Sequence, residues 1–562
     1  MTDYTLPHHQ AVQQLTSPGA PFEIIEREIA GVPLKVFRNA YPNLRDYLNE
    51  GRQHKSALFL QYQHQSLSFD AFFQAVDGLT GMLAQQAHIA KGDRVAIAMR
   101  NRPEWLIAFT AIIQLGAVAV PLNSWGKGEE LNQGLVDSEA KLLICDGPRL
   151  RYVRSVGSTV PTLLVDGESE DNPEYHWSEA IEGTANDGAP LDLPIIAPDD
   201  PALLLFTSGT SGRPKGALFQ HQNCCQAMMN VELIGAATYM TNMDAMNQQL
   251  ARGTPPKTLL AVPLFHVSGL FSQFVVNLRH GRGLYLMYKW DAKEALRLVR
   301  EEGITVLMGA PVMMLELLSL PDAEASDFEN IANISGGGAG TPEMLHELYL
   351  QTMKQTLAGA GWGMTETGGT GAAFTGRFMH ERPGASGFPS PIVDFSFRDE
   401  DGNAVSPGAP GEIWVRSSTA ISGYYSGGGE DEFVDGWFKT GDIGYINDEG
   451  LLYICGRAKD MIIRGGENVY PAEIEDCLLE FPGCAEAAVV GIHSEHWGEE
   501  VAAVVRMEPD TQAQAEDLQR HCGQHLAAFK VPVVIEMASE PLARNAVNKL
   551  LKAAIKKTYF PA

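Results

Sequence analysis

The sequence predicts an α/β fold: a large N-terminal domain of mostly parallel sheets covered by helices, with a small β subdomain, and then a small α+β domain. The 562 residues are too many for one hydrophobic core, so two or more domains are expected. From about Asp93, short β-branched runs alternate with longer amphipathic segments, as in parallel sheets covered by helices. Between Phe395 and Tyr453, Gly and Pro interrupt short strands, which indicates a small antiparallel subdomain. A second boundary lies near Gly456.

The individual elements follow from local patterns. In the large domain, apolar runs predict strands and a proline-opened stretch predicts a helix: strands Arg94–Met99, Ala117–Pro121, Lys141–Cys145, Ala202–Phe206 and Thr258–Val262, and helix Pro103–Gln114. Near the C-terminus we expect strands Met461–Ile463, Ala485–Gly491 and Val501–Arg506, a helix from Pro471 and a helix over Ala513–Leu526. The most apolar stretch, Trp105–Leu122, is interrupted by polar residues and Pro121, so we expect a buried helix and strand rather than a membrane span.

Composition and charge exclude some classes of function. The net charge of −27 argues against nonspecific binding to nucleic acid or to anionic membranes, and an anionic ligand would need local cations, backbone amides or a metal. The seven cysteines are irregularly spaced and the first residues do not resemble a signal peptide, so we expect free thiols in a cytoplasmic protein. The run Gly427-Gly428-Gly429 is expected in a surface loop. The oligomeric state is not determined, and a homodimer remains open.

The strongest chemical signal is the segment Phe206–Gly216, which reads FTSGTSGRPKG. Its glycines allow the backbone to approach anionic oxygens closely, its hydroxyls donate hydrogen bonds, and Lys215 supplies a cation. The segment lacks the GxxxxGK[ST] pattern of a Walker A loop. The sequence therefore predicts a different phosphate-binding loop, made of Thr207, Ser208, Gly209, Thr210, Ser211, Gly212 and Lys215.

This loop resembles the phosphate loop of the adenylate-forming superfamily, which comprises acyl-CoA synthetases, peptide-synthetase adenylation domains and firefly luciferase. The resemblance runs from about Asp93 to Lys549 through several motifs in the family's order. It implies an AMP-binding domain over residues 1–457 and a mobile C-terminal domain over residues 458–562, with a hinge at Lys459. It also implies two half-reactions: a carboxylate attacks ATP to give acyl-AMP and pyrophosphate, and a thiol then displaces AMP.

Further motifs carry the nucleotide and catalytic roles that the resemblance implies. In the motif GWGMTE, Glu366 would bind Mg²⁺ together with Thr207, Thr365 would contact the α-phosphate, and Trp362 would pack on adenine. Asp442 and Arg457 would bind the ribose. Lys549 would bridge the carboxylate and the α-phosphate in the transition state, although Val547-Asn548 replaces the usual Ser/Thr-Gly before it. The remaining expected nucleotide contacts are Gly337, Gly338, Ala339, Gly361 and Gly363.

The acid and thiol sites are also predicted by resemblance. His266, in the motif PLFHVSG, would orient the substrate carboxylate; the acyl pocket would be completed by Ser268, Gly269, Ala310, Gly336 and Gly363. The CoA contacts would be Gly465, Gly466, Phe529 and Lys530. The pocket segments are apolar and carry no obvious partner for a second carboxylate or an ammonium, which favours a hydrophobic monocarboxylic acid of the fatty, aryl or alicyclic type.

We therefore expect an ATP-dependent acyl-CoA synthetase with ATP, Mg²⁺ and coenzyme A as cofactor and co-substrates. Three alternatives remain open at this point. The protein could load a separate acyl carrier protein, it could be a catalytically silent homologue that senses a nucleotide or acyl ligand, or it could carry out luciferase-like oxygenation. The absence of Walker and kinase motifs disfavours an unrelated kinase.

Overall fold

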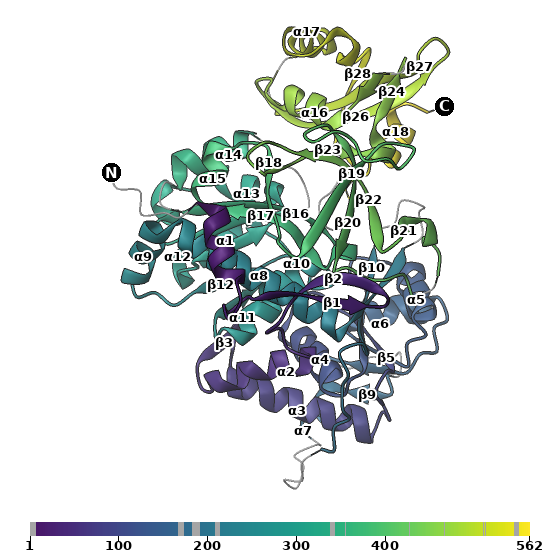
Figure 1. The fold of residues 1–562 in the computed structure, drawn as a ribbon. Helices are drawn as coiled ribbons and strands as arrows, with labels where there is room; N and C mark the ends of the chain where they lie inside the picture. Colours follow the sequence, from purple (N-terminus) through teal and green to yellow (C-terminus); the bar gives the residue numbers. More distant parts are fainter. Residues whose placement is uncertain are drawn as a thin grey trace.

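Two large sheets and a smaller C-terminal sheet organise the computed structural model (Figure 1). The structure describes residues 7–166, 173–182, 191–207, 214–337, 343–353, 356–425, 427–465, 467–509, 511, 513–544 and 550–561. The strands of the first two sheets come from the large N-terminal part of the chain, and the third sheet begins after Asp460. In the view of Figure 1 the C-terminal unit, coloured yellow-green, lies above the rest of the molecule.

The first sheet is seven-stranded and is covered on both faces. Its strands lie in the order β11 (Lys215–Gln220), β10 (Pro201–Thr207), β6 (Val118–Pro121), β5 (Arg94–Ala98), β7 (Leu142–Cys145), β8 (Thr162–Leu164) and β9 (Tyr175–His176). The central strands β6 and β7 are buried along their whole length, as expected for parallel strands between two helical layers. The helices of this region are α3 (Phe69–Gln85), α4 (Pro103–Gln114), α5 (Gly128–Asp137), α6 (Gly147–Ser155) and α7 (Trp177–Glu182).

The second sheet contains fourteen strands and joins parallel and antiparallel regions. Its order is β19 (Val393–Arg398), β20 (Gly411–Ser417), β22 (Trp437–Ile446), β23 (Leu452–Arg457), β18 (Ala385–Pro389), β17 (Gly369–Thr375), β16 (Leu357–Met364), β15 (Asn333–Gly336), β14 (Val306–Gly309), β12 (Lys257–Leu260), β13 (Gly283–Leu286), β3 (Leu58–Tyr62) and β4 (Gln65–Ser68), with β21 (Phe433–Val434) beside β22. Its helices are α8 (His221–Thr241), α9 (Met243–Ala251), α10 (Val267–Gly269), α11 (Val276–Arg279), α12 (Ala292–Glu302), α13 (Pro311–Leu318), α14 (Glu343–Thr352) and α15 (Arg377–Glu381).

The N-terminal segment packs on the outside of this assembly. Helix α1 (His8–Thr16) lies against α8, and the hairpin of β1 (Ile24–Ile29) and β2 (Val32–Phe37) is fixed to α8 by the Gln226 side chain, which accepts a hydrogen bond from Phe37 N at 2.8 Å. Helix α2 (Leu44–Asn49) follows. None of the helices in the described part of the chain is long and apolar enough to cross a membrane.

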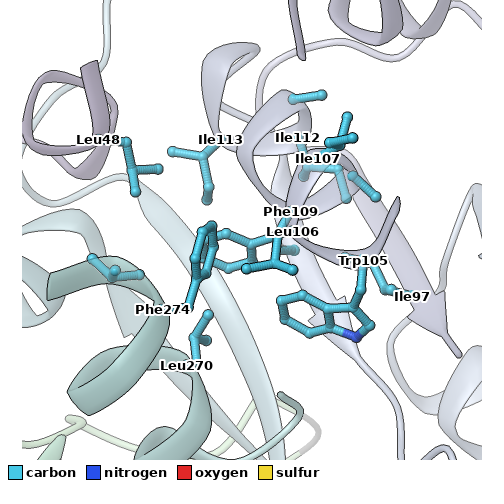
Figure 2. Packing of buried hydrophobic residues seen from close by; sticks show 14 of the residues in the cluster. Leu48, Ile97, Trp105, Leu106, Ile107, Phe109, Ile112, Ile113, Leu270 and Phe274 are labelled. Atoms are coloured by element: carbon cyan, nitrogen blue, oxygen red, sulfur yellow. The ribbon is translucent and has the colours of Figure 1, made fainter. Parts of the chain in front are cut away.

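A continuous hydrophobic core connects the two large sheets. Figure 2 shows side chains of α4, among them Phe109, packed beside Leu270 and Phe274, which lie in a π-helical segment (Leu270–Val275) after the His266 motif. The rings of Phe109 and Phe274 meet edge to face, with their centroids 6.0 Å apart. The apolar helix α4 therefore holds the segment that carries His266 against the first sheet.

The C-terminal unit is a five-stranded sheet packed against two helices. Its strands lie in the order β25 (Glu467–Val469), β24 (Ile462–Arg464), β27 (Gly498–Met507) and β26 (Cys484–Ser494), and β28 (Val534–Met537) pairs with β27. Helices α16 (Pro471–Leu479) and α17 (Ala515–His525) bury one face, and α18 (Lys552–Tyr559) packs on β26. The predicted α+β unit is confirmed, and strand β26 extends three residues beyond its predicted end because it forms a long hairpin with β27.

The predicted elements of the large domain are also found, with small shifts in their ends. Helix α4 has the predicted bounds, and the apolar stretch around it is a buried helix and strand as expected. The region from Phe395 to Tyr453 is antiparallel as predicted, but it is not a detached subdomain, because β23 pairs with β18 and so continues the second sheet.

Candidate active site

The carboxyl ends of several parallel strands of the second sheet meet at one edge. Gly309 of β14 is in register with Gly336 of β15, which is in register with Ala360 of β16. The residues next in the chain after these three therefore lie side by side: Ala310, then Gly337, then the last part of β16, Gly361–Met364. Strand β12 neighbours β14, so the His266 motif, which follows β12, begins at the same edge. This edge is where ligands bind in open α/β sheets, and it brings the expected acyl and nucleotide segments together.

The phosphate loop is flanked by the antiparallel strands β10 and β11. Residues 208–213 lie outside the described residues. The expected ligands Ser208, Gly209, Thr210, Ser211 and Gly212 are among these undescribed residues. The two residues that flank them are placed: Thr207 ends β10 and pairs with Lys215, the first residue of β11. The Thr207 hydroxyl donates to Lys215 O at 3.4 Å.

The Lys215 ammonium belongs to a network of charged and polar side chains. Its Nζ lies 2.6 Å from Glu432 Oε1 and 4.9 Å from the centre of the Tyr424 ring. The Tyr424 hydroxyl lies 2.8 Å from Glu432 Oε2 and 3.2 Å from Glu366 Oε1, so its single proton is shared between two carboxylates. The expected phosphate-loop lysine and the expected metal ligand are therefore connected through two residues that the motifs did not single out.

Backbone pairing explains how Tyr424 reaches this position. Ala217 of β11 forms an isolated antiparallel bridge with Tyr424, and Tyr425 N donates to Gly216 O at 2.8 Å. The segment around Tyr424 thus runs beside β11 and places the phenol ring over the lysine. Burial, together with two neighbouring carboxylates, raises the pKa of Tyr424 well above its usual range, so it is a hydrogen-bond donor at neutral pH.

Glu366 sits in a 3₁₀ turn, Thr365–Thr367, directly after β16. The turn is held on the segment that follows β20, because Ile421 N donates to Glu366 O at 2.9 Å and Thr419 Oγ1 donates to Thr367 O at 2.7 Å. Glu366 is only 7% exposed, and burial raises the pKa of its carboxyl group. A nearby cation would favour the charged form of this carboxylate.

The residues present fit Mg²⁺. Within the described ranges no group of three or more His, Cys, Asp or Glu side chains could hold a metal ion by itself. A single buried carboxylate, Glu366, with one oxygen bonded to Tyr424, can supply one hard oxygen ligand. Mg²⁺ is typically bound by one or two carboxylates with substrate phosphates and water as the other ligands. Thr207, at the end of β10, is the second expected ligand and lies beside Lys215 in the hairpin.

The residues expected to bind ribose and adenine form a second cluster. Asp442 of β22 and Arg457 of β23 are cross-strand partners, and Arg457 Nε lies 2.8 Å from Asp442 Oδ1. The Trp362 indole Nε1 donates to Asp442 Oδ2 at 2.8 Å. Asp442 is 6% exposed and Trp362 is 7% exposed. Trp362 packs against Gly371 and Phe395, so its indole orients Asp442, whose oxygens each keep a further lone pair for a hydroxyl group.

His266 is half-buried at the expected acyl side of the same edge. Its Nε2 is buried without a hydrogen-bond partner, and burial lowers the pKa of the imidazole to about 4. The histidine is therefore neutral at pH 7 and can orient a carboxylate through an N–H donor rather than by charge. Nearby, Gly269 is required for packing, since a Cβ there would lie 2.6 Å from Pro263 O, whereas the side chain of Ser268 is exposed.

The expected thiol-step residues lie in the C-terminal unit. Gly465 (φ +61°) donates its N–H to Trp497 O at 2.8 Å, and a Cβ at Gly465 would lie 2.6 Å from the Trp497 ring. Lys530 pairs with Glu473 at 2.6 Å, and its Nζ lies 5.8 Å from the centre of the Phe529 ring. The partners named here all belong to the C-terminal unit. Gly338, Ala339, Gly466 and Lys549 lie outside the described residues.

Sequence motifs missed Tyr424, Glu432 and Trp497. Tyr424 and Glu432 flank the glycine run, whose Gly427 and Gly428 lie in an exposed loop as expected. Gly429 of that run is less exposed and lies beside Lys215 and Tyr424. The signal that could have found them was this unusual run of glycines shortly before the Asp442 motif. A carboxylate partner for Lys215 is not visible in the sequence, because the two residues are 217 positions apart.

Comparisons with known proteins identify the family and relatives of this chain. The family described as AMP-binding enzyme matches residues 48–425, and the AMP-binding enzyme C-terminal domain matches residues 473–549. The long-chain-fatty-acid–CoA ligase FadD13 of Mycobacterium tuberculosis (strain H37Rv) is 31% identical over 475 residues, which cover 84% of this chain and 89% of the relative. The indoleacetate–CoA ligase of Aromatoleum aromaticum is 32% identical over 505 residues, covering 89% and 94%.

A solved structure gives the same result. The o-succinylbenzoate coenzyme A synthetase of Bacillus subtilis in complex with ATP and magnesium superposes with a TM-score of 0.73 at 28% identity, and the match covers 92% of this chain and all of the other.

Proposed function

Because this chain belongs to the AMP-binding enzyme family, it is an ATP-dependent acid–CoA ligase, and we propose that its acid is a hydrophobic monocarboxylic acid. The enzyme uses ATP, Mg²⁺ and CoA, and it converts the acid first to an acyl-adenylate and then to a CoA thioester. The observation that supports the assignment to this chain is the connection of Lys215, at the start of β11 in the first sheet, through Tyr424 to Glu366, which follows β16 of the second sheet.

In the first half-reaction we propose that the chain positions charge around the α-phosphorus. When bound, Mg²⁺ would neutralise the phosphates as pyrophosphate leaves, with Glu366 and Thr207 as its protein ligands. Lys215 donates to phosphate oxygens and Thr365 contacts the α-phosphate. Asp442, oriented by Trp362 and Arg457, accepts the ribose hydroxyls. Lys549 bridges the carboxylate and the α-phosphate as charge shifts between them.

In the second half-reaction we propose that the C-terminal unit rotates about Lys459, which is exposed in a 3₁₀ turn (Ala458–Asp460) between the second and third sheets. This assigns residues 1–457 to the AMP-binding domain and residues 458–562 to the mobile domain. Rotation would withdraw Lys549 and bring the loop of Gly465 and Gly466 to the acyl-adenylate, with Phe529 and Lys530 toward the CoA nucleotide. The thiol then attacks the acyl carbon and AMP leaves.

The acid is proposed from the chemistry of the acyl side. The expected lining combines a neutral imidazole with small residues: Ala310, Gly336 and Gly363. These residues include no second cation for a dicarboxylate and no anion for an amino group. Fatty, aryl and alicyclic acids all meet this description. The relatives that act on a long-chain fatty acid and on indoleacetate both support a hydrophobic acid.

The test is pyrophosphate release with MgATP and a panel of fatty, aryl and alicyclic acids, with and without CoA, and with a holo-carrier protein in parallel. The proposal expects release that depends on the acid, turns over faster with CoA, and leaves AMP and an acyl-CoA. A dicarboxylic or amino acid as the best substrate would contradict the proposed class. Faster turnover with the carrier than with CoA would make carrier loading the better assignment.

The compartment and assembly state are separate proposals. All seven cysteines are free thiols, which supports a reducing compartment and hence the cytoplasm. Fractionation of the producing cells tests this directly. A homodimer is tested by light scattering on the purified chain, where a mass near 61.1 kDa would mean a monomer and twice that mass a dimer.

A further inference from the structure

Glu432 has no role in the reaction as described so far, although it contacts the only lysine of the phosphate loop. Its Oε1 lies 2.6 Å from Lys215 Nζ, and its Oε2 accepts the Tyr424 hydroxyl at 2.8 Å. Both oxygens of this carboxylate are thus directed into the corner where phosphates are expected. A carboxylate in that place repels an incoming polyphosphate and neutralises the cation that should attract it.

The glycine run Gly427-Gly428-Gly429 builds this contact. All three glycines have φ between +73° and +82°, a conformation that other residues rarely adopt. A Cβ at Gly429 would lie 2.8 Å from both Lys215 Nζ and a ring carbon of Tyr424. The 3₁₀ turn Glu430–Glu432 follows at once, and Glu432 N donates to Gly429 O at 2.9 Å. The loop can therefore approach the phosphate corner closely and deliver Glu432 to the lysine.

The Lys215–Glu432 ion pair is weak enough for another anion to replace Glu432 at the lysine. The two side chains are 22% and 35% exposed, and an ion pair that solvent reaches contributes little net stability. The Tyr424 hydroxyl lies within hydrogen-bond distance of both Glu432 and Glu366, and this shared contact keeps the two carboxylates close together. A polyphosphate brings several charges to one ammonium and can replace a single carboxylate there.

We propose that Glu432 is the resting counter-ion of Lys215: the phosphates of MgATP displace it, and it recovers the ammonium when pyrophosphate leaves. Glu432 is then a positioning residue that weakens the binding of pyrophosphate and so favours its release. Tyr424 keeps the displaced carboxylate in place for its return. This inference rests on the proposed function, because it takes pyrophosphate to be the product held by Lys215.

The test measures the affinity of the full chain for inorganic pyrophosphate in the presence of Mg²⁺ by calorimetry, without acid or CoA. Glu432→Gln keeps the length of the side chain and the acceptor for Tyr424 but removes the charge. We expect it to bind pyrophosphate about three- to five-fold more tightly than the unaltered chain, the upper part of the range for a partly exposed charge pair. The matched control is Asp431→Asn, which removes an exposed carboxylate one position away and should leave the affinity unchanged.

A mutant cycle separates exchange from simple repulsion. In a Lys215→Gln background, Glu432→Gln should change the affinity less than about two-fold, because the ammonium to be exchanged is gone. The shorter Glu432→Asp variant keeps the charge but withdraws it from Lys215, and it should fall between the unaltered chain and Glu432→Gln. The Glu432→Asp variant also allows the affinity for pyrophosphate to be compared if Glu432→Gln does not fold.

The outcomes are distinguishable. Weaker or unchanged pyrophosphate binding by Glu432→Gln, or an equal tightening with and without Lys215, would overturn the counter-ion role and leave the ligase assignment standing. If neither the unaltered chain nor the variants bound pyrophosphate, the proposed function and this inference would fail together.

Discussion

The two sides of the site are built in opposite ways. On the phosphate side, Lys215, Glu432, Tyr424 and Glu366 form a connected set of charged and polar groups with distances of 2.6 to 3.2 Å. On the acyl side, the expected lining consists of small residues and His266, whose Nε2 is buried without a hydrogen-bond partner and whose pKa is lowered to about 4 by burial. The first side is connected by an ion pair and hydrogen bonds, whereas the imidazole Nε2 of the second has no such partner.

This difference separates two kinds of function. In the proposed function the phosphate side handles ATP, which every turnover shares, so changes there should lower the reaction with all acids to the same degree. The acyl side is proposed to meet only the acid, so changes there should redistribute activity among acids. The following experiments test that separation, from the largest expected effect to the smallest.

Replacement of the metal carboxylate should have the largest effect. Glu366→Gln keeps the acceptor for Tyr424 but removes the buried charge, and acid-dependent pyrophosphate release should fall about 10²- to 10³-fold. The loss should be the same for each acid of the panel. Thermal unfolding serves as the control for folding. Near-normal turnover would show that Glu366 is not a metal ligand. A loss that differs from one acid to another would show that the two sides do not have separate functions.

Lys549→Ala should distinguish the half-reactions. Because Lys549 is proposed to stabilise charge only while the carboxylate attacks the α-phosphorus, its loss should slow adenylation about 100-fold. Formation of the thioester from pre-made acyl-adenylate and CoA should stay within about two-fold of the unaltered chain. The two rates are measured separately by rapid quench. An equal loss of both would contradict the assignment to the first step.

Gly336→Ala should change the acid rather than the nucleotide. Gly336 lies at the end of β15 with ordinary φ, and a Cβ there would meet its nearest atom, in Pro311, at 3.5 Å, so the backbone tolerates the methyl group. We expect kcat/KM for the bulkiest accepted acid to fall about ten-fold relative to the smallest, at an unchanged KM for ATP.

Gly363→Ala is the contrasting variant. A Cβ at Gly363 would lie 1.8 Å from Gly369 O, so this change should destabilise the fold instead of altering selectivity. An equal loss for all acids in Gly336→Ala would show that Gly336 does not line the acyl pocket.

The smallest effect concerns the pH dependence of stability. The pKa of His266 falls from its ordinary value near 6.5 to about 4 in the folded chain, so between these values the unfolded chain binds a proton that the folded chain does not. Stability from this group is present above pH 6.5 and is lost as the pH falls toward 4. His266→Gln should therefore lose less melting temperature between pH 6.5 and 4.5 than the unaltered chain.

The comparison with the variant is needed because desolvation also lowers the pKa values of the half-buried His8 and the buried His221 to about 4. Identical pH profiles for the two proteins would show that His266 is already solvated or charged in the folded state.

The sequence by itself determined the architecture and predicted which residues handle the nucleotide. Apolar strands alternating with longer segments indicated parallel sheets covered by helices, and the proline-opened segment Pro103–Gln114 became α4 with its predicted bounds. These features depend on local pattern, which a single sequence carries. The motifs around Lys215, Glu366 and Asp442 were recognisable for the same reason, since each combines its special residues within a few positions.

Only the tertiary structure decided which groups those motifs meet. The sequence did not indicate that Glu432 is a partner of Lys215. It predicted a surface loop for the glycine run before Glu432, but not that Gly429 lies beside Lys215. The pairing of β18 with β23, which joins the antiparallel region to the large sheet, was also not evident from the sequence. The physical reason is common to all three: hydrogen bonds and ion pairs act over a few ångströms in space, and their partners here come from distant parts of the chain.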